Sequence, residues 1–495
     1  MSNQWNECRQ KGLEYCESEP LAYSNAIQPH GGLLNLDSDY NVTHASANLT
    51  HYLPHLPANL LSRPLPEDLK TILTPALNRL PKMPGSRTEL FAVAINNHPR
   101  MDFVISRGLD NVVIEIFIHD THPSKLPAYN VPMKTPSNTE SALELHNKIA
   151  SLLQDLTDFD RVMVYAFRED GDGEVLAEAR RTEKYGSYLG LRFPASDIPL
   201  IARNLYKKNP WRLIPDRSVQ PIPILSHSDT PPDLNWSDLR SVSPIHQIYL
   251  ANMGVRASFS LPIMAGSELW GLIACHHATP HSLTLKTMRS ASQISRHYAL
   301  VISTWLAETG MRFVDKLDIF YQEQRLAMLK HGDIISAIPD IVPNLFELFS
   351  ASGLAIKLGN VWAHTGDTPN LSQLTILSDS FDCVENDSIQ VINSFSLDYP
   401  QLEYSPVAGA QAIKLLTHKN DSLQIWLFRK ELIQEVQWGG NPNKPVEFHD
   451  GKMGIAPRQS FDKWVEKRKG YCSPWKPEDR LAAKRLRQLL IELYG

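Results

Sequence analysis

The chain has 495 residues, of which 42% are hydrophobic and 21% charged, a globular composition that excludes wholesale disorder. This length exceeds the ~100–150 residues of a typical domain, so we expect several domains. A net charge of −5 gives no basic surface for nucleic acid or an anionic membrane. No apolar run approaches the ~20 residues needed to span a bilayer.

The polar N-terminus, residues 1–12, lacks the regions of a signal peptide. The five cysteines are scattered and include no CxxC pair, which argues against a disulfide framework and against a zinc ribbon. We therefore expect a cytoplasmic protein with reduced thiols, no metal site, and neither nucleic acid nor membrane among its partners.

The first segment runs to about residue 130 and shows short alternating stretches at 32–36, 90–95 and 111–118. Proline-rich breaks separate these stretches, a pattern typical of a small sheet with flanking helices. The Pro/Ser/Thr-rich residues 126–139 are predicted to form a linker.

The second segment is predicted to begin with an amphipathic helix over residues 140–156. Alternating apolar residues then predict strands at 161–167, 175–180, 257–263 and 269–276. This order indicates a second α+β domain of about 170 residues.

A long helix is predicted from residue 283 to about residue 331, because this stretch has no proline and only Gly310 interrupts its pattern. Its apolar stripe consists of Ile294, Tyr298, Val301 and Trp305. Such a helix is typical of a spine that joins two domains or two chains. A third α+β segment follows.

The chain ends in a predicted helix over residues 477–494. Its apolar positions Ala482, Leu486, Leu489 and Leu493 leave a seam that we expect to continue beyond residue 495, in a longer protein.

Enzyme motifs are not evident. Asp170 and Asp172 lie in a glycine-rich turn that lacks the later ligands of a calcium loop, so a hairpin turn is favoured. Cys275, His276 and His277 are consecutive on a predicted strand, so their side chains alternate between faces and cannot converge on a metal. Core packing with one pocket-facing histidine is the better interpretation.

A dense polar cluster in apolar surroundings marks the second segment, at residues 192–199, 202–206, 211–214, 240–246 and 249–255. Arginines suit bidentate binding of carboxylates. Histidine, tyrosine and aspartate beside them suit a large, partly polar, conjugated ligand. Any one of these residues alone is more often a satisfied polar group, so the density of the cluster carries the argument.

At these residues the chain resembles the phytochrome family, and the resemblance covers nearly all of it. The motifs are Tyr-Cys-Glu-Ser-Glu-Pro at 15–20, Ile-Gln-Pro-His-Gly-Gly-Leu-Leu at 27–34, the block 193–206, Ser-Pro-Ile-His at 243–246 with Gly-Val at 254–255, Trp-Gly-Leu-Ile-Ala-Cys-His-His at 270–277, Trp-Gly-Gly at 438–440 and Pro-Arg-Gln-Ser-Phe at 457–461.

The resemblance implies an α+β fold of three domains along a helical spine. An N-terminal extension and a PAS domain would occupy residues 1–130, and a chromophore-binding GAF domain residues 131–310. A PHY domain would occupy 311–477, with a tongue hairpin at about 432–475. Residues 478–495 would begin an output-linker helix. The family also implies a figure-of-eight knot, with the proline-rich residues 217–238 as its lasso.

The implied cofactor is biliverdin IXα, held by a thioether to Cys16. A cysteine before the first domain distinguishes biliverdin binders from plant-type phytochromes, and Ile245 rather than a cysteine precedes His246. Cys8 is the nearby competitor, but it lacks the flanking motif of Cys16.

The resemblance also assigns roles within the pocket. The carbonyl of Asp197, with His246, would hold the pyrrole nitrogens and a central water. Arg212 and Arg240 would bind the propionates. The assisting residues would be Tyr206, Ser258 and Ser260. His276 would bond the D-ring carbonyl, and Tyr165, Phe193 and Tyr249 would wall the D-ring, with Ile198 among the cofactor-binding residues.

Light would isomerise one double bond and rotate the D-ring, converting red- and far-red-absorbing states. Trp438 and Arg458 would lie on the two arms of the tongue. Arg458 would pair with Asp197 at rest, and Ser460 would replace it when the tongue refolds from hairpin to helix.

The signal would pass through a parallel homodimer to a C-terminal output domain, a histidine kinase or a diguanylate cyclase, outside this chain, which is itself no enzyme. Which state is the dark state stays open. The alternatives are a small-molecule-sensing PAS-GAF regulator without photochemistry and a bilin-modifying enzyme.

Overall fold

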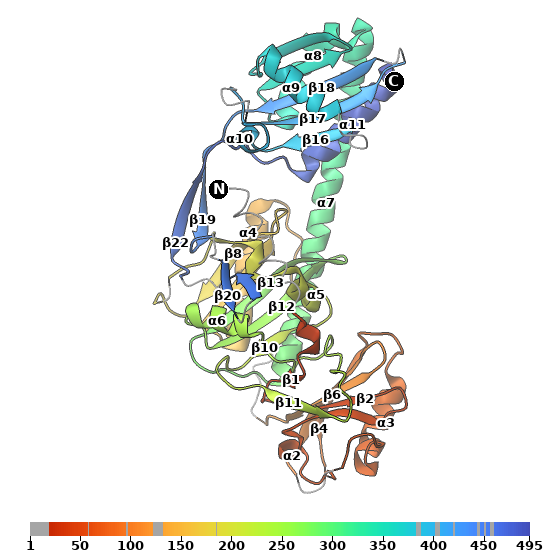
Figure 1. Cartoon of the computed structure of the whole chain (residues 1–495), viewed down its shortest axis with the longest axis vertical. Coiled ribbons are helices and arrows are strands. Elements are labelled where there is room, and N and C mark those ends of the chain that lie inside the picture. Colours follow the sequence, from red (N-terminus) through yellow and green to blue (C-terminus); the bar gives the residue numbers. More distant parts are fainter. Residues whose placement is uncertain are drawn as a thin grey trace. The chain divides into compact units, whose positions relative to one another are not determined.

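The computed structural model describes residues 19–57, 59–95, 98–121, 132–184, 186–382, 388–400, 406–418, 421–442, 446–449, 452–455 and 460–495 (Figure 1). Two compact units divide the chain. One comprises Met1–Trp305 with Gln437–Trp464, and the other Leu306–Val436 with Val465–Gly495. Each unit is described by itself. None of the helices in the described ranges is long and apolar enough to cross a membrane.

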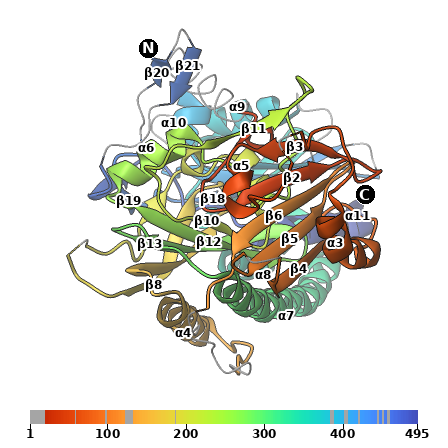
Figure 2. The ribbon, with the colours of Figure 1, turned by 90° about the horizontal axis from the view of Figure 1, so that it is seen from below.

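The first unit contains a seven-stranded sheet in the order β1-β11-β3-β2-β6-β5-β4, whose strands β11 to β4 can be followed in Figure 2. Its elements are η1 Leu21–Tyr23, β1 Ala26–Ile27, β2 Gly32–Leu36, β3 Val42–Ser46, α2 Leu49–Tyr52, α3 Glu67–Arg79, β4 Arg87–Val93, β5 Met101–Arg107, β6 Val112–Ile118 and β11 Ile222–Ser226.

Strand β11 comes from the predicted lasso and pairs with β1 and with β3. The first domain therefore completes its sheet with a strand from the second. The chain before residue 19 lies outside the described residues, so the knot stays a prediction.

The two faces of this sheet serve different cores, as the period of two along a strand requires. In β6, Ile114 and Ile116 face the first domain's own core, with α3. Val113 and Phe117 face the opposite side and join the core of the second domain. Glu115 lies between them and is fully buried.

The second domain is built on an eight-stranded sheet in the order β10-β12-β13-β7-β8-β9-β19-β22. Its elements are α4 Thr139–Thr157, β7 Arg161–Phe167, β8 Gly173–Arg180, β9 Arg192–Phe193, η2 Ala195–Asp197, α5 Leu200–Tyr206, β10 Arg212–Ile214, α6 Pro244–Asn252, β12 Ala257–Ala265 and β13 Glu268–His277, extended by β19 Gln434–Gly439 and β22 Lys463–Arg468.

Two local predictions for this domain are confirmed. Helix α4 begins at Asn138, whose side chain accepts a hydrogen bond from Ser141 N in a capping box. The acidic turn is a hairpin between β7 and β8, in which Gly171 has a φ of 83° and Asp172 N donates to Asp170 Oδ1.

The long helix α7 extends over Leu285–His331, as predicted (Figure 1). Its first turns join the core that also contains α4, and Tyr298 Oη contacts His146 Nδ1 at 2.6 Å inside it. That core covers one face of the second domain's sheet. The opposite face, with Met163, Tyr165 and Val175, belongs to another cluster and lines the site described below.

The second unit holds a five-stranded antiparallel sheet in the order β15-β14-β18-β17-β16. Its elements are the C-terminal part of α7, α8 Ile334–Phe349, β14 Gly353–Leu358, β15 Val361–Gly366, α9 Leu371–Asp382, β16 Ile389–Ile392, α10 Phe395–Asp398, β17 Gly409–Leu416, β18 Ser422–Arg429 and α11 Pro477–Tyr494.

The terminal helix α11 has the predicted bounds, but its apolar stripe is not left open. Ala482, Leu486 and Leu489 are buried in the core of the second unit, and Leu493 packs against that core. Tyr321 Oη from α7 donates to the carbonyl of Ala482 at 2.6 Å. The expectation of an unfinished seam at these positions was therefore wrong.

Candidate functional site

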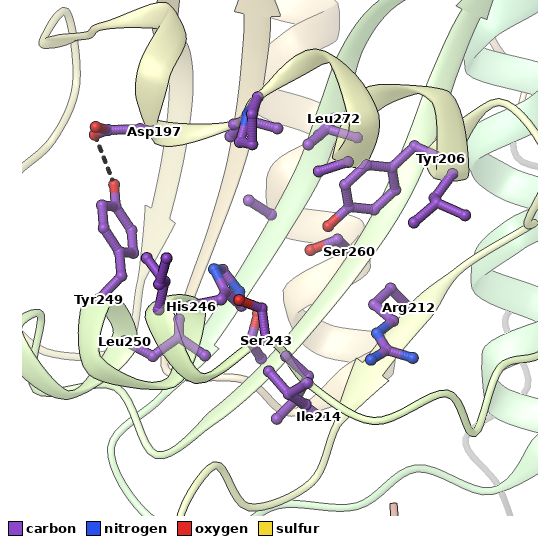
Figure 3. Close-up of a pocket in the computed structure, with 18 of the residues that line it drawn as sticks. Asp197, Tyr206, Arg212, Ile214, Ser243, His246, Tyr249, Leu250, Ser260 and Leu272 are labelled. Atoms are coloured by element: carbon purple, nitrogen blue, oxygen red, sulfur yellow. Dashed lines mark hydrogen bonds between the residues drawn. The ribbon is translucent and has the colours of Figure 1, made fainter. Parts of the chain in front are cut away.

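One cavity in the first unit lies between α5, α6 and the face of the sheet formed by β7, β12 and β13 (Figure 3). Its free volume, measured to the centre of a water-sized sphere, is about 220 Å³. A single water needs about 10–15 Å³ on this measure, so the cavity has room for a much larger molecule. Twelve residues predicted from the sequence line it: Tyr165, Phe193, Asp197, Ile198, Tyr206, Arg212, Arg240, His246, Tyr249, Ser258, Ser260 and His276.

Two buried arginines form the polar end of this cavity. Arg212 on β10 donates to the carbonyls of Asp238 and Ser241 at 2.9 and 3.0 Å, and also to that of Arg240. Arg240 is 7% exposed, and its hydrogen bond to Leu234 O is 3.4 Å long. Burial and the nearby Arg212 charge lower the pKa of Arg240 to about 9. Burial also lowers the pKa of Arg212. Two cations held together away from water favour an anionic ligand.

Hydroxyl groups surround the arginine pair. Ser258 and Ser260 are two residues apart on β12 and therefore share one face. Ser260 is opposite Arg212 in the neighbouring strand β10. Tyr206, near the end of α5, points with Ser260 and Arg212 toward the same region of the cavity (Figure 3). These groups can donate hydrogen bonds to ligand oxygens beside the cations.

His246 and Tyr249 come from α6, which begins with Pro244 at its first position. Three residues apart on a helix, they share a face, and their rings stack at 6.0 Å. Tyr249 Oη donates to Asp197 Oδ2 at 3.0 Å (Figure 3). Burial and the Arg212 charge lower the pKa of His246 to about 4, so the ring is neutral at pH 7. A neutral imidazole can both donate and accept.

His276 on β13 faces the same cavity. Burial lowers its pKa to about 3, with help from the charges of Arg161 and His246. Its Nδ1 is buried without a hydrogen-bond partner among the described residues. Such an atom costs about 1–3 kcal/mol, which a polar ligand atom can recover.

The alternation predicted for residues 275–277 is confirmed. Cys275 lies in the core on the opposite face, where burial raises the pKa of its thiol. His277 stacks on His281, with ring centroids 4.7 Å apart. In the described part of the chain, no three His, Cys, Asp or Glu side chains could hold a metal ion.

Aromatic rings close the other end of the cavity. Phe193 lies 6.0 Å from the ring of Tyr165 and 5.9 Å from that of Tyr188. Phe461, which is 7% exposed, meets Tyr249 edge-on at 5.0 Å. The sequence motif contained Phe461 without giving it a role, because its contact with α6 depends on tertiary structure.

Two described parts of the segment 437–464, at 437–442 and 460–464, contact this aromatic end. Trp438 is buried and pairs with Arg192 of β9. Gly440 N donates to Asp462 O at 2.8 Å, which joins the two arms of the segment. Strands β20 Val446–His449 and β21 Lys452–Ile455 pair with each other between those arms. That residues 432–475 form the tongue stays a prediction.

Of the other residues predicted to attach the cofactor or to switch, only Ser460 lies in the described part of the chain. Ser460 is exposed, donates to Asp462 Oδ2 at 3.0 Å and accepts from Asp462 N at 3.3 Å. Cys16, Cys8 and Arg458 lie outside the described residues. Their roles stay predictions.

Sequence reasoning gave no role to Glu19, which lines the cavity and accepts from Ser243 Oγ at 2.9 Å. Burial raises the pKa of Glu19. Met163 and Val175 were also missed, although the alternation of β7 places Met163 on the same face as Tyr165.

Comparison with known proteins identifies three domains in the chain. The family model of the PAS fold matches residues 16–116, that of the GAF domain residues 141–302, and that of the phytochrome region residues 321–495. The chain is 33% identical to a bacteriophytochrome of Pseudomonas aeruginosa and 31% identical to one of Xanthomonas campestris pv. campestris. Each match covers 97% of this chain, but 66% of the Pseudomonas protein and 78% of the Xanthomonas protein.

Solved structures agree over the same length. The photosensory core module of a Stigmatella aurantiaca phytochrome matches with a TM-score of 0.79 and 29% identity over 97% of each chain. The bacteriophytochrome RpBphP3 of R. palustris matches with a TM-score of 0.76 and 28% identity, over 97% of this chain and 99% of that one.

The PAS-GAF-PHY order and the ligand-sized cavity define a photosensory module. The chain belongs to the phytochrome family of red/far-red photoreceptors, and its module is of bacteriophytochrome type. This family implies a bilin chromophore. The residues of the site fit a bilin. Two buried arginines can bind the carboxylates of a bilin, and the buried His276 Nδ1 can bond one of its polar atoms. Aromatic rings line another part of the cavity, where the apolar rings of a bilin can pack.

Proposed function

We propose that this chain binds biliverdin IXα covalently through Cys16 and reports red and far-red light to an output domain. The buried arginine pair supports this proposal most directly. Arg212 and Arg240 lie together in a cavity that also offers a neutral histidine at each of two places, His246 and His276. A dicarboxylic, conjugated ligand matches that combination of groups.

The chain's own residues would hold the chromophore in three ways. Arg212 and Arg240 would neutralise its two carboxylates, with hydroxyl donors from Tyr206, Ser258 and Ser260. His246 and the backbone carbonyl of Asp197 would meet the ring nitrogens, while His276 would donate to a carbonyl oxygen at the aromatic end. When bound, the bilin supplies light absorption and the isomerisation of a double bond.

Signal transfer would begin at the docked segment. Phe461 packs on Tyr249, and Tyr249 bonds Asp197, so a movement in the cavity reaches residues 437–464 through two contacts. We propose that this segment is the tongue, that Arg458 pairs with Asp197 in the resting state, and that Ser460 replaces it after refolding. A segment with two alternative structures is the kind of element that a local change can switch.

The remaining parts of the proposal concern assembly. Helix α7 exposes the apolar side chains Leu300, Met311, Ile319, Leu326 and Leu329. Burial of these side chains would favour a parallel homodimer. The chain spans 66% to 78% of the curated bacteriophytochromes that it matches, so a C-terminal output domain, a histidine kinase or diguanylate cyclase, is proposed for the remainder. A cytoplasmic location is proposed with it.

The test mixes the purified protein with biliverdin and follows absorption before and after denaturation. We expect a sharpened red band in the native protein, and pigment that remains attached after denaturation. The Cys16→Ala variant should keep the native band and lose the attachment, whereas Cys8→Ala should keep both. If the wild-type protein leaves the broad spectrum of free pigment unchanged, the site is no bilin site, and a small-molecule sensor without photochemistry takes its place.

A further inference from the structure

The loop segment 234–241, which carries Arg240, is held by a carboxylate of the first domain. Glu115 on β6 is fully buried, and its Oε1 accepts hydrogen bonds from Ser237 Oγ and Leu239 N, both at 2.7 Å. From the second domain, Arg212 donates to the carbonyls of Asp238 and Arg240 in the same segment. The position of the arginine pair therefore depends on a residue outside the GAF domain.

An ion pair with the first domain also holds this segment. Arg87 on β4 donates through both terminal nitrogens to the carboxylate of Asp238. Its guanidinium also lies 4.5 Å above the ring of Trp211, which lines the cavity. Arg87 further contacts Glu89 at 3.6 Å, and Glu89 contacts Arg289 of α7 at 3.5 Å.

Three arginines and three carboxylates act on one another around Glu115. Arg87, Arg212 and Arg240 are positive; the charges of Asp238 and Glu115 act on all three of them, and that of Glu89 acts on Arg87. His30 is also buried nearby and stays neutral, because burial and Arg212 lower its pKa to about 3. A ligand with two carboxylates would add two negative charges to this set.

Glu115 can compensate for the added negative charge by binding a proton. Its Oε2 is buried without a hydrogen-bond partner among the described residues. Burial and the Asp238 charge raise the pKa of Glu115 to about 7, against the opposing effect of Arg87. Negative charges added beside Arg212 and Arg240 raise the pKa further, so a proton from solvent would bind Glu115 when the ligand enters.

We propose that Glu115 is a positioning residue for the anionic end of the bilin, and that it exchanges its negative charge for a proton when the ligand's carboxylates arrive. The inference rests on the proposed function. It makes bilin affinity depend on pH: binding with proton uptake weakens as pH rises above the value at which free Glu115 ionises.

The experiment measures the dissociation constant of biliverdin between pH 7 and 8.5, in a Cys16→Ala background so that binding stays reversible. The dissociation constant of the parent protein should rise about tenfold more per pH unit than that of the Glu115→Gln variant, because one additional proton is linked. A proton taken up by the bilin itself is common to both proteins. Glu174→Gln, which changes a carboxylate facing Arg168, is the matched control and should behave like the parent.

A second ligand tests the same inference without substituting Glu115. Biliverdin dimethyl ester has no carboxylate charge, so in the parent protein its affinity should lack the additional pH dependence. Equal pH slopes for parent and Glu115→Gln, or for diacid and ester, overturn the inference. If no protein binds biliverdin at any pH, it is the proposed function that fails.

Discussion

Gly439 offers a sharp test of how residues 437–464 dock. A Cβ at this position would lie 2.6 Å from two ring carbons of Phe193, far inside normal contact distance. Phe193 cannot retreat easily, because it is 4% exposed and lies against Tyr165 and Tyr188. The backbone beside Gly439 is held by the Trp438–Arg192 pairing and by the bond of Gly440 N to Asp462 O.

The Gly439→Ala substitution should therefore weaken docking by about 1–3 kcal/mol, the usual cost of overpacking. Since a tenfold change in an equilibrium corresponds to about 1.4 kcal/mol, the undocked population should rise between about 5-fold and 150-fold. Amide hydrogen exchange reports this population in peptides that cover residues 434–442 and 460–468. Exchange there should accelerate, while peptides of β12 and β13 keep their wild-type rates.

Two further variants control the interpretation. Gly310→Ala, at a position on α7 with open space around it, should leave exchange of the docked segment unchanged. Adding Phe193→Leu to Gly439→Ala removes the ring atoms that clash and should restore part of the protection. Wild-type exchange in Gly439→Ala would refute the docking contact, and an absence of rescue would refute the assigned cause.

Further predictions concern stability. The pKa values of His146 and His246 are lowered to about 4 by burial, so the unfolded chain binds more protons below pH 6.5. As the pH falls from 6.5 to about 4, each of these histidines should lower the unfolding free energy of the ligand-free protein by about 1.4 kcal/mol per pH unit. An unfolding free energy that stays constant from pH 7 to 5.5 in urea titrations would contradict this. In the second unit, Arg429 donates to Phe349 O and pairs with Asp479 at 3.0 Å. Arg429→Met should cost about 3–5 kcal/mol of unfolding free energy, because the Asp479 carboxylate then lacks its cation and keeps only the hydrogen bond from Lys476 N. One kcal/mol of destabilisation lowers the thermal unfolding midpoint by at least about 2 °C. A variant whose midpoint lies within about 2 °C of wild type would therefore show that this ion pair contributes little to stability. Tyr298→Phe should cost about 1–3 kcal/mol, because His146 Nδ1 then loses its partner inside the core, and a chemical-denaturation midpoint equal to wild type would rule out that contact.

Local pattern predicted several elements closely. Strands β2 and β7 and helix α11 have the predicted bounds, because alternation, glycine and proline mark their ends. Strand β5 was not predicted, since Asp102 and Ser106 break its apolar pattern. In the fold, Asp102 bonds His119 at 2.7 Å and Ala92 N at 2.8 Å, and the pairing of β4, β5 and β6 that brings these groups together is not visible in the alternation of one strand.

In the candidate site, too, some residues could be predicted from the sequence and others depend on contacts between distant segments. Family motifs predicted twelve residues that line one cavity, because those motifs cluster in a single domain. Glu115 was beyond sequence reasoning, since alternation assigns it a face but cannot reveal that Ser237, 122 positions later, bonds it. Phe461 escaped for the same reason, because its partner Tyr249 lies in another segment of the chain. The roles of these two residues therefore follow from contacts between distant segments, which local sequence patterns do not show.

The central claim is that this cavity holds a photoactive bilin. The most direct measurement is a difference spectrum of the biliverdin-loaded protein after alternating red and far-red light. The proposal predicts mirror-image difference spectra that repeat over several cycles, and their loss when His276, which lines the cavity, is replaced by alanine. A bound pigment whose spectrum does not change reversibly under either light would contradict the claim.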